Sequence, residues 1–107
     1  MKNDFFGNWT SQVLKGVLPL IVLFLLRKKT LYGYEMIQEI RSVFGIDVAE
    51  GTLYPLLVRL LKEDQLNAQW VEQPSGIPRK YYSITPTGRK NLKDMQTYLP
   101  GLISKIN

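Results

Sequence analysis

Residues 51–61, GTLYPLLVRLL, indicate the fold of this chain. The leucines of this segment, at positions 53, 56, 57, 60 and 61, recur at spacings of three and four, which predicts one apolar face of an α-helix. The opposite face has two cations but is otherwise uncharged, and consists of Thr52, Tyr54, Pro55, Val58, Arg59 and Lys62. An ordinary solvent-facing helix surface has more charge, so this composition favours contact with a partner.

Pro55 conflicts with the helical pattern around it. We expect the helix to begin near Asp47 or Ala49 and to end near Asp64, with Asp47 and Glu50 at capping-box spacing. Pro55 then lies beyond the first turn, where its ring would crowd the carbonyl of Gly51, so a tight or bent first turn is expected. Such conflicts between local preference and overall pattern are found at functional sites.

Two helices precede this segment, and a hairpin and one more helix follow it. The expected order is an arm at 1–10, helices at 11–27 and 32–44, the helix just described, strands at 67–72 and 79–84, and a helix at 85–107. Thr85 is the expected N-cap of this last helix, and Pro86 its first residue. The fold class is therefore mainly α with a small β-hairpin (α+β). Three helices and then a hairpin is the order of a winged helix-turn-helix at 11–84, leaving 85–107 as a separate C-terminal helix.

Composition excludes several classes of function. The 107 residues make one domain, and 14 Lys and Arg against 9 Asp and Glu give a net charge of +5, which permits a polyanionic partner. Neither Cys nor His is present, so thiol nucleophiles, imidazole bases and Cys/His zinc sites are excluded. We expect no enzyme activity, no cofactor and no metal. The absence of cysteine fits the reducing cytoplasm.

The apolar segment GVLPLIVLFLL, residues 16–26, lies between Lys15 and Arg27. It is shorter than the roughly 20 residues of a membrane span, so we expect no membrane contact. A helix that is apolar on nearly all sides is instead buried in a core or between subunits. Leu18, within this segment, is assigned to a dimer interface.

The hairpin is expected to present cations next to aromatic rings. In RKYY, residues 79–82, alternation places Arg79 and Tyr81 on one face and Lys80 and Tyr82 on the other. Gly76 in the connecting loop would let the backbone approach DNA closely. With Arg59 and Lys62 of the preceding helix, Arg79 and Lys80 would then contact phosphates. The alternative is an ordinary hairpin with solvent-exposed cations, with Tyr54 half-buried in the core.

Two further features concern packing. Trp70 is expected to pack beneath the hairpin, with stacking on a planar ligand as the alternative. In the C-terminal helix, residues at 3-4-3-4 spacing predict a coiled-coil seam that a second copy would cover, namely Leu92, Met95, Leu99, Leu102 and Ile106. Pro100-Gly101 interrupts the seam, so this helix is expected to kink or to break into two pieces.

Three segments together resemble the PadR family of bacterial transcriptional regulators, in its short form with a single C-terminal helix. They are LYGYEMIQEI (31–40), GTLYPLLVRLLKE (51–63) and GIPRKYYSITPTGRKNL (76–92). The resemblance implies a winged helix with a C-terminal dimerisation helix, acting as a homodimeric repressor at palindromic promoter DNA. It assigns DNA contacts to Tyr34, Thr52, Tyr54, Pro55, Arg59, Gly76, Arg79 and Lys80, and in some members a small-molecule effector binds at the dimer interface.

The sequence departs from the family pattern in two places. Relatives often have Ser-Pro before G-T-L-Y, where this chain has Ala49-Glu50. Multidrug-binding relatives use a tryptophan on the C-terminal helix, whereas this helix has Tyr98 and no tryptophan. A winged-helix module that binds proteins stays open as an alternative, and a peripheral membrane protein is a weaker one, since helix 11–27 lacks a polar face.

Overall fold

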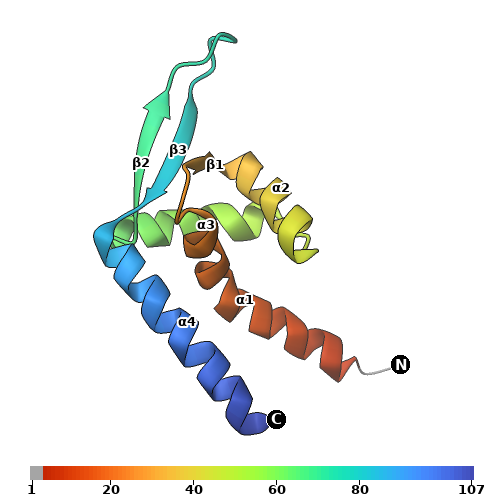
Figure 1. The fold of residues 1–107 in the computed structure, drawn as a ribbon. Coiled ribbons are helices and arrows are strands. Elements are labelled where there is room, and N and C mark those ends of the chain that lie inside the picture. The colour runs from red at the N-terminus through yellow and green to blue at the C-terminus, as the bar shows by residue number, and fades with distance from the viewer. Residues whose placement is uncertain (1–3) are drawn as a thin grey trace.

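The computed structural model describes residues 4–107, which form four helices and a three-stranded antiparallel sheet (Figure 1). The elements in chain order are α1 (Phe5–Leu25), β1 (Leu31–Tyr32), α2 (Gly33–Phe44), α3 (Glu50–Lys62), β2 (Leu66–Val71), β3 (Arg79–Ile84) and α4 (Pro86–Ile106). The predicted α+β class is confirmed.

Helix α1 begins earlier than expected, because Asp4 caps it. The Asp4 carboxylate accepts a hydrogen bond of 2.9 Å from the backbone N–H of Gly7, which is the usual contact of an N-cap side chain. Residues 5–10, predicted as an arm, therefore form the first turns of α1, and that prediction was wrong for them. Residues 1–3 of the predicted arm lie outside the described part of the chain.

Helix α3 has the predicted tight first turn but not the predicted cap. The N–H groups of Thr52 and Leu53 both donate to the carbonyl of Ala49, each at 3.0 Å, and the first of these bonds closes a turn one residue tighter than the α-helix. Asp47 does not cap the helix, because the helix begins at Glu50 and Ala49 occupies the N-cap position; the Asp47 carboxylate instead pairs with the Arg41 guanidinium at 2.7 Å. Pro55 is accommodated within the helix, and Gly51, whose carbonyl loses its usual partner, is exposed to water.

The sheet contains a strand that the sequence did not predict. Its order is β1-β3-β2, and the short β1 pairs with β3 through Leu31 opposite Tyr82 and Tyr32 opposite Tyr81. The predicted hairpin is confirmed as β2 and β3, with Leu66 opposite Ile84 at its base and Val71 opposite Arg79 at its far end. The hairpin extends well beyond the helices (Figure 1).

One core holds the helices and the base of the sheet together. The leucines of α3 face it as predicted, since Leu53 and Leu57 are fully buried and Leu60 is 3% exposed. They pack with residues from α1, α2, β1 and β3, among them Leu18, Val22, Leu23, Leu31, Met36, Ile40 and Tyr82. Burial of such aliphatic side chains contributes about 1.5–3 kcal/mol each. This packing buries the leucine face of α3 and leaves its polar face at the surface.

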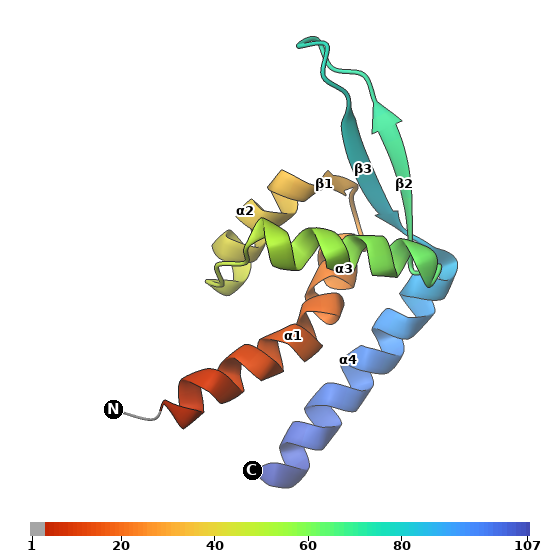
Figure 2. The same cartoon turned by 180° about the vertical axis from the view of Figure 1, so that it is seen from behind.

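Helix α4 starts as predicted and does not break. The Thr85 hydroxyl accepts a 2.9 Å hydrogen bond from the Gly88 N–H, and Pro86 occupies the first helical position. A kink or a break was predicted at Pro100-Gly101, and the break does not occur, because a single helix spans Pro86–Ile106. Pro100 lacks an N–H for the Gln96 carbonyl, but Gln96 is exposed, so water can satisfy that oxygen. Helices α1 and α4 leave the domain opposite the hairpin and diverge (Figures 1 and 2).

Helix α1 is long and apolar enough, by length and composition, to cross a membrane. It exceeds the eleven-residue segment counted in the sequence because residues 5–15 continue the same helix. Five residues of its second half are buried in the core, namely Leu18, Ile21, Val22, Leu23 and Leu25. A core helix of a globular domain has these same properties, and the burial of this half favours that interpretation.

Candidate nucleic-acid interface

The polar face of α3 lies at the surface. The exposed residues on this face are Thr52, Pro55, Val58, Arg59 and Lys62. The Nε atom of Arg59 lies 3.8 Å from carboxylate oxygen Oε2 of Glu63, one helical turn later. Both side chains of this ion pair are exposed to solvent, so the pair contributes little stability. The Arg59 guanidinium therefore remains available to another anion. The first turn of α3, with its exposed Gly51, lets a second molecule approach the helix backbone closely.

Tyr54 is only partly available, because its ring lies against the start of α2. It is 37% exposed, and a Cβ added to Gly33 would lie 2.4 Å from ring atom Cε1. Burial raises the pKa of Tyr54, and the charges of Glu50 and Tyr32 raise it further. Tyr54 therefore contacts α2 but stays exposed and does not belong to the buried core, as the predicted alternative would require. Tyr34, the neighbour of Gly33 in the first turn of α2, is 54% exposed.

Arg79, at the far end of the paired part of the hairpin, belongs to an aromatic cluster with Tyr32 and Tyr81. Its guanidinium carbon lies 4.5 Å from the ring centre of Tyr32, and the Tyr32 and Tyr81 rings meet edge to face at 5.5 Å. The predicted sharing of one strand face by Arg79 and Tyr81 is consistent with these contacts. Stacking on an aromatic ring holds the planar guanidinium in one orientation while its N–H groups stay free.

Lys80 occupies the other face, between two aromatic rings. Its ammonium nitrogen lies 5.7 Å from the Trp70 ring centre and 5.8 Å from that of Tyr82. Tyr82 is buried, but Trp70 is 64% exposed, so the prediction that Trp70 packs beneath the hairpin was wrong. The physical reason is register, since Trp70 pairs with Lys80 on the part of the hairpin that extends beyond the core.

The turn of the hairpin depends on glycine. Gly76 has φ of +86° and donates its N–H to the Gln73 carbonyl at 2.9 Å. A side chain is strained in this left-handed conformation. A Cβ at Gly76 would meet no atom of residues 4–107 within 4 Å, so glycine is required there by the backbone conformation of the turn and not by a contact with these residues.

Two residues near this surface were missed from the sequence. Lys15 of α1 lines a shallow, open hollow of about 330 Å³ together with Thr52, Pro55, Leu56 and Arg59 of α3. This hollow places a third helix cation beside the polar face of α3. Gly33 is the second, because it allows the close approach of Tyr54. Its only sequence signal was a glycine at the start of a helix, where a side chain is normally tolerated.

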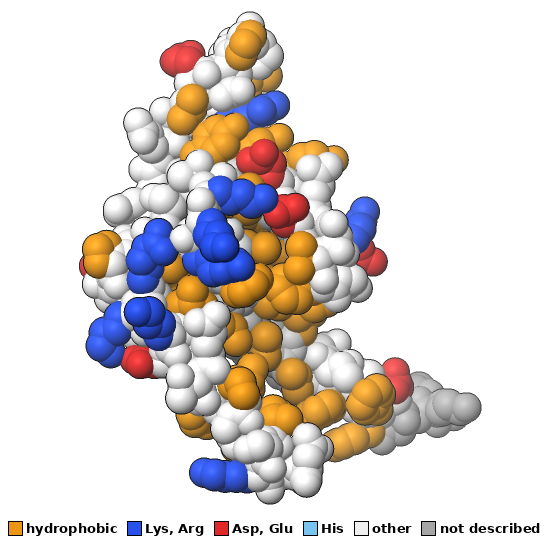
Figure 3. Space-filling view, viewed as in Figure 1, with side chains coloured by type: hydrophobic (Ala, Val, Ile, Leu, Met, Phe, Trp, Pro, Cys, Tyr) orange, Lys and Arg blue, Asp and Glu red, His pale blue; other side chains and the backbone are white. Residues whose placement is uncertain are grey.

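The residues predicted for a dimer interface differ in accessibility. Leu18 is 2% and Leu92 5% exposed within the single chain, so they offer little surface to a partner. Met95 and Leu99 are half-buried, whereas Leu102 and Ile106 are 40% and 72% exposed. Figure 3 shows hydrophobic side chains along both diverging helices. Phe5, Phe6 and Trp9 of α1, which the sequence did not assign to the dimer interface, are more than half exposed.

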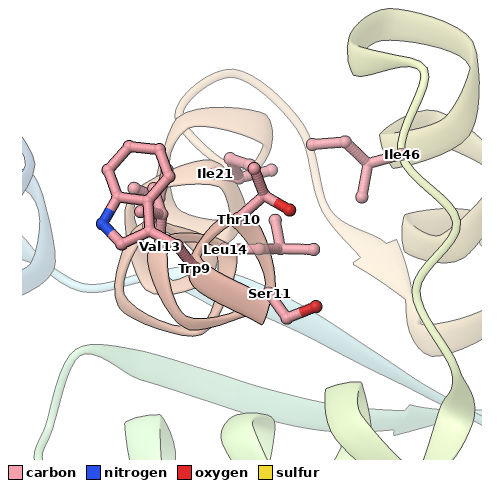
Figure 4. A pocket seen from close by; sticks show the side chains of 8 residues that line it. Trp9, Thr10, Ser11, Val13, Leu14, Ile21 and Ile46 are labelled. Carbon is pink, nitrogen blue, oxygen red and sulfur yellow. The ribbon is translucent and has the colours of Figure 1, made fainter. Parts of the chain in front are cut away.

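An apolar hollow lies on the side of α1. It measures about 390 Å³ and is lined by Trp9, Thr10, Ser11, Val13, Leu14, Val17 and Ile21 of α1 and by Ile46 from the connection between α2 and α3. In Figure 4, Ile46 lies opposite the side chains of α1 across this hollow. A second hollow of about 290 Å³ separates Gly16, Val17 and Leu20 of α1 from Met95, Tyr98 and Leu99 of α4.

Three helices, a short first strand and a protruding hairpin define a winged helix-turn-helix protein, extended here by a C-terminal helix. Comparison with known proteins gives the family. Residues 22–94 match the model of the transcriptional regulator PadR-like family. The chain belongs to this family of transcriptional regulators, whose members are not enzymes.

Solved structures of relatives agree with this assignment. A PadR-like transcription factor from Bacteroides fragilis is 39% identical with a TM-score of 0.80, covering 94% of this chain and 96% of that one. A PadR family regulator from Eggerthella lenta is 30% identical with a TM-score of 0.87, covering 96% and 89%. Bacillus subtilis PadR, solved in complex with operator DNA, is 28% identical with a TM-score of 0.70. The match covers 75% of this chain and 46% of that one.

Proposed function

We propose that the protein is a homodimeric, sequence-specific repressor that binds palindromic promoter DNA through α3 and the hairpin. The observation that supports this most directly is the arrangement of cations around α3. Arg59 and Lys62 on α3 and Arg79 and Lys80 on the hairpin occupy the exposed parts of two elements that meet at the core. Bacillus subtilis PadR was solved in complex with operator DNA, which supports DNA as the partner of this chain.

In this mechanism α3 enters the major groove, and the hairpin lies along the neighbouring backbone. Thr52, Tyr34 and the exposed edge of Tyr54 would offer hydroxyl groups to phosphates or base edges. Arg79, oriented by the Tyr32 ring, and Lys80, placed by Trp70 and Tyr82, would contact phosphates on either side of the hairpin. Gly76 would let the turn of the hairpin approach the DNA closely.

The homodimer is proposed to form through the divergent ends of α1 and α4. Leu102 and Ile106 of α4 and Phe5, Phe6 and Trp9 of α1 are large apolar side chains left exposed in the single chain. A surface of this kind is typical of an interface between subunits. A two-fold dimer would place its two α3 helices in successive major grooves, about 34 Å apart.

Regulation by a small molecule at the dimer interface is a further part of the proposal. The two apolar hollows beside α1 contain Trp9 and Tyr98, whose rings could contact a planar ligand. A second copy of the chain would enclose these open surfaces. A repressor must reach promoter DNA, which in bacteria lies in the cytoplasm, so we propose a cytoplasmic location for the protein.

The test is fluorescence anisotropy of purified protein with duplex DNA from its own promoter, against a scrambled duplex of equal length. Salt is varied between about 50 and 200 mM, the range over which phosphate contacts lose most of their contribution. Tight binding that prefers the promoter and weakens steeply with salt is expected.

A protein-interaction module is the second candidate. The observation that favours it is the run of exposed aromatic side chains at the start of α1, which could dock on a larger partner. Weak binding that is equal for both duplexes and insensitive to salt would support this candidate against the DNA-binding repressor.

A further inference from the structure

Helix α4 begins directly on the turn that ends α3, and Thr85 joins the two. The Thr85 hydroxyl donates to the carbonyl of Asp64 at 2.6 Å and accepts from the Gly88 N–H at 2.9 Å. The Thr85 N–H donates to the Gln65 carbonyl at 3.1 Å. Thr85 is 4% exposed, so water does not compete with these bonds. One buried side chain therefore caps α4 and fastens it to the end of α3.

Two more residues of α4 contact the same turn. A Cβ at Gly88 would lie 2.3 Å from the Gln65 carbonyl oxygen, so the helix backbone rests directly on that group. The side-chain amide of Asn91 donates to the side-chain oxygen of Gln65 at 2.7 Å. Thr85, Gly88 and Asn91 are spaced by three residues and so lie on one side of the first turns of α4.

The turn itself is held to α3, and α4 has a second attachment. Gln65 donates its N–H to the Leu60 carbonyl at 2.9 Å, and Asp64 adopts a left-handed conformation with φ of 59°. On another side of α4, the Arg89 guanidinium donates to the carbonyl of Arg27, at the end of α1, at 2.8 Å. With contacts to both α3 and α1, the base of α4 is fixed in direction as well as in position.

This attachment links the two surfaces that the proposed function requires. Helix α3 presents the proposed DNA face, whereas α4 presents the proposed dimer seam more than one turn beyond its base. A helix of 21 residues is about 30 Å long, so a small change of angle at its base displaces the far end. The direction of α4 relative to α3 therefore decides where the partner's α3 lies.

We propose that Thr85 and Asn91 are positioning residues that set the separation of the two α3 helices, and with it the half-site spacing that the dimer accepts. The inference rests on the proposed homodimeric DNA binding. Inserting one base pair between half-sites moves one of them by about 3.4 Å and rotates it by about 35°. If α4 is held rigidly on α3, the dimer cannot adjust to the altered spacing and binds it weakly. If this attachment is loosened, the two α3 helices can move to fit the altered spacing.

The experiment compares spacing profiles of Thr85→Val and Asn91→Ala with the wild type. Thr85→Val keeps the branched shape and loses the hydroxyl, and Thr85→Ser is the matched control that keeps it. An operator is first selected from a random duplex library with the wild type, and versions with one base pair removed or added between half-sites are then prepared. Circular dichroism and sedimentation confirm that each variant is folded and dimeric.

The measured quantity is the ratio of Kd for altered spacing to Kd for native spacing. We expect this ratio to fall about fivefold in Thr85→Val and Asn91→Ala, the factor that corresponds to one lost hydrogen bond, and to stay at the wild-type value in Thr85→Ser. A residue with only a structural role would weaken binding equally at every spacing. That uniform loss, or an unchanged profile, would overturn the inference and leave the proposed function intact. Failure of the wild type to select any duplex would overturn both.

Discussion

The ring of Tyr54 rests on the backbone of Gly33, so closely that a Cβ at position 33 would lie 2.4 Å from Cε1 and 2.6 Å from the hydroxyl oxygen. This contact joins the first turn of α2 to the first turn of α3. It also explains why Tyr54, on the polar side of the α3 pattern, is partly buried. The angle between the two helices of the helix-turn-helix pair thus depends on the absence of a side chain at position 33.

Substituting Gly33→Ala should destabilise the fold by roughly 1–3 kcal/mol, because the new methyl group forces the Tyr54 ring or α3 to move. In a Tyr54→Ala background the same substitution should cost nothing, since the ring is gone. Urea denaturation of the four proteins measures this. The matched control is Gly51→Ala on α3, where a Cβ meets nothing within 4 Å and is expected to stabilise the helix by about 0.5–1 kcal/mol. An equal penalty for Gly33→Ala in both backgrounds would refute the contact.

Removing cations from the proposed DNA face should weaken binding to all duplexes alike. Arg59→Ala and Lys80→Ala are each expected to lower the slope of log K against log salt by about 0.9, because each removes one phosphate contact. Anisotropy at several salt concentrations gives that slope. Lys105→Ala, in the last turn of α4, loses the same charge away from this face and serves as control. Wild-type binding by both test variants would exclude the assigned surface.

A charge in the α4 seam should dissociate the proposed dimer. Leu99→Glu places a carboxylate at a half-buried apolar position, where a partner helix would have to desolvate it. Sedimentation velocity is expected to show monomers. Thr97→Glu adds the same charge on the opposite side of α4, at an exposed position, and should remain dimeric. If Leu99→Glu still sediments as a dimer, the interface lies elsewhere.

Stability should fall at alkaline pH through two tyrosines. Burial raises the pKa of Tyr54 above its ordinary value. Burial also raises the pKa of Tyr82, and the charge of the nearby Tyr54 raises it further. The folded state thus holds these protons more tightly than the unfolded state does. The resulting stability is fully present below about pH 10, the pKa of an unfolded tyrosine, and is lost as the pH rises through the higher folded value.

Urea denaturation between about pH 9 and 11 tests this prediction, because that range spans the ordinary tyrosine pKa. Tyr54→Phe and Tyr82→Phe should each lose less stability over the range than the wild type does. Lysine titration is common to all three proteins and cancels in the comparison. An identical pH dependence in the wild type and both variants would contradict the assigned shifts.

Features governed by neighbours along the chain were predictable from the sequence. The leucine spacing of residues 53–61 determined which face of α3 is buried. Thr85-Pro86 determined where α4 begins, and the left-handed Gly45 determined where α2 ends. The hairpin of β2 and β3 followed from alternation and a turn containing Gly76. Each of these depends on backbone preferences or on periodicity within a few residues, and the family resemblance followed from the same segments.

Other features depend on contacts between residues far apart in sequence. Strand β1 exists because Leu31 and Tyr32 pair with Tyr82 and Tyr81 of β3, about fifty residues later in the chain. Trp70 is exposed because the register with Lys80 places it beyond the core, whereas Leu18 is buried by the helices around it. Pattern along the chain specifies a helix or strand and its apolar side. Only the tertiary structure decides what that side meets, and it alone brought Gly33 beneath Tyr54 and Asn91 against Gln65.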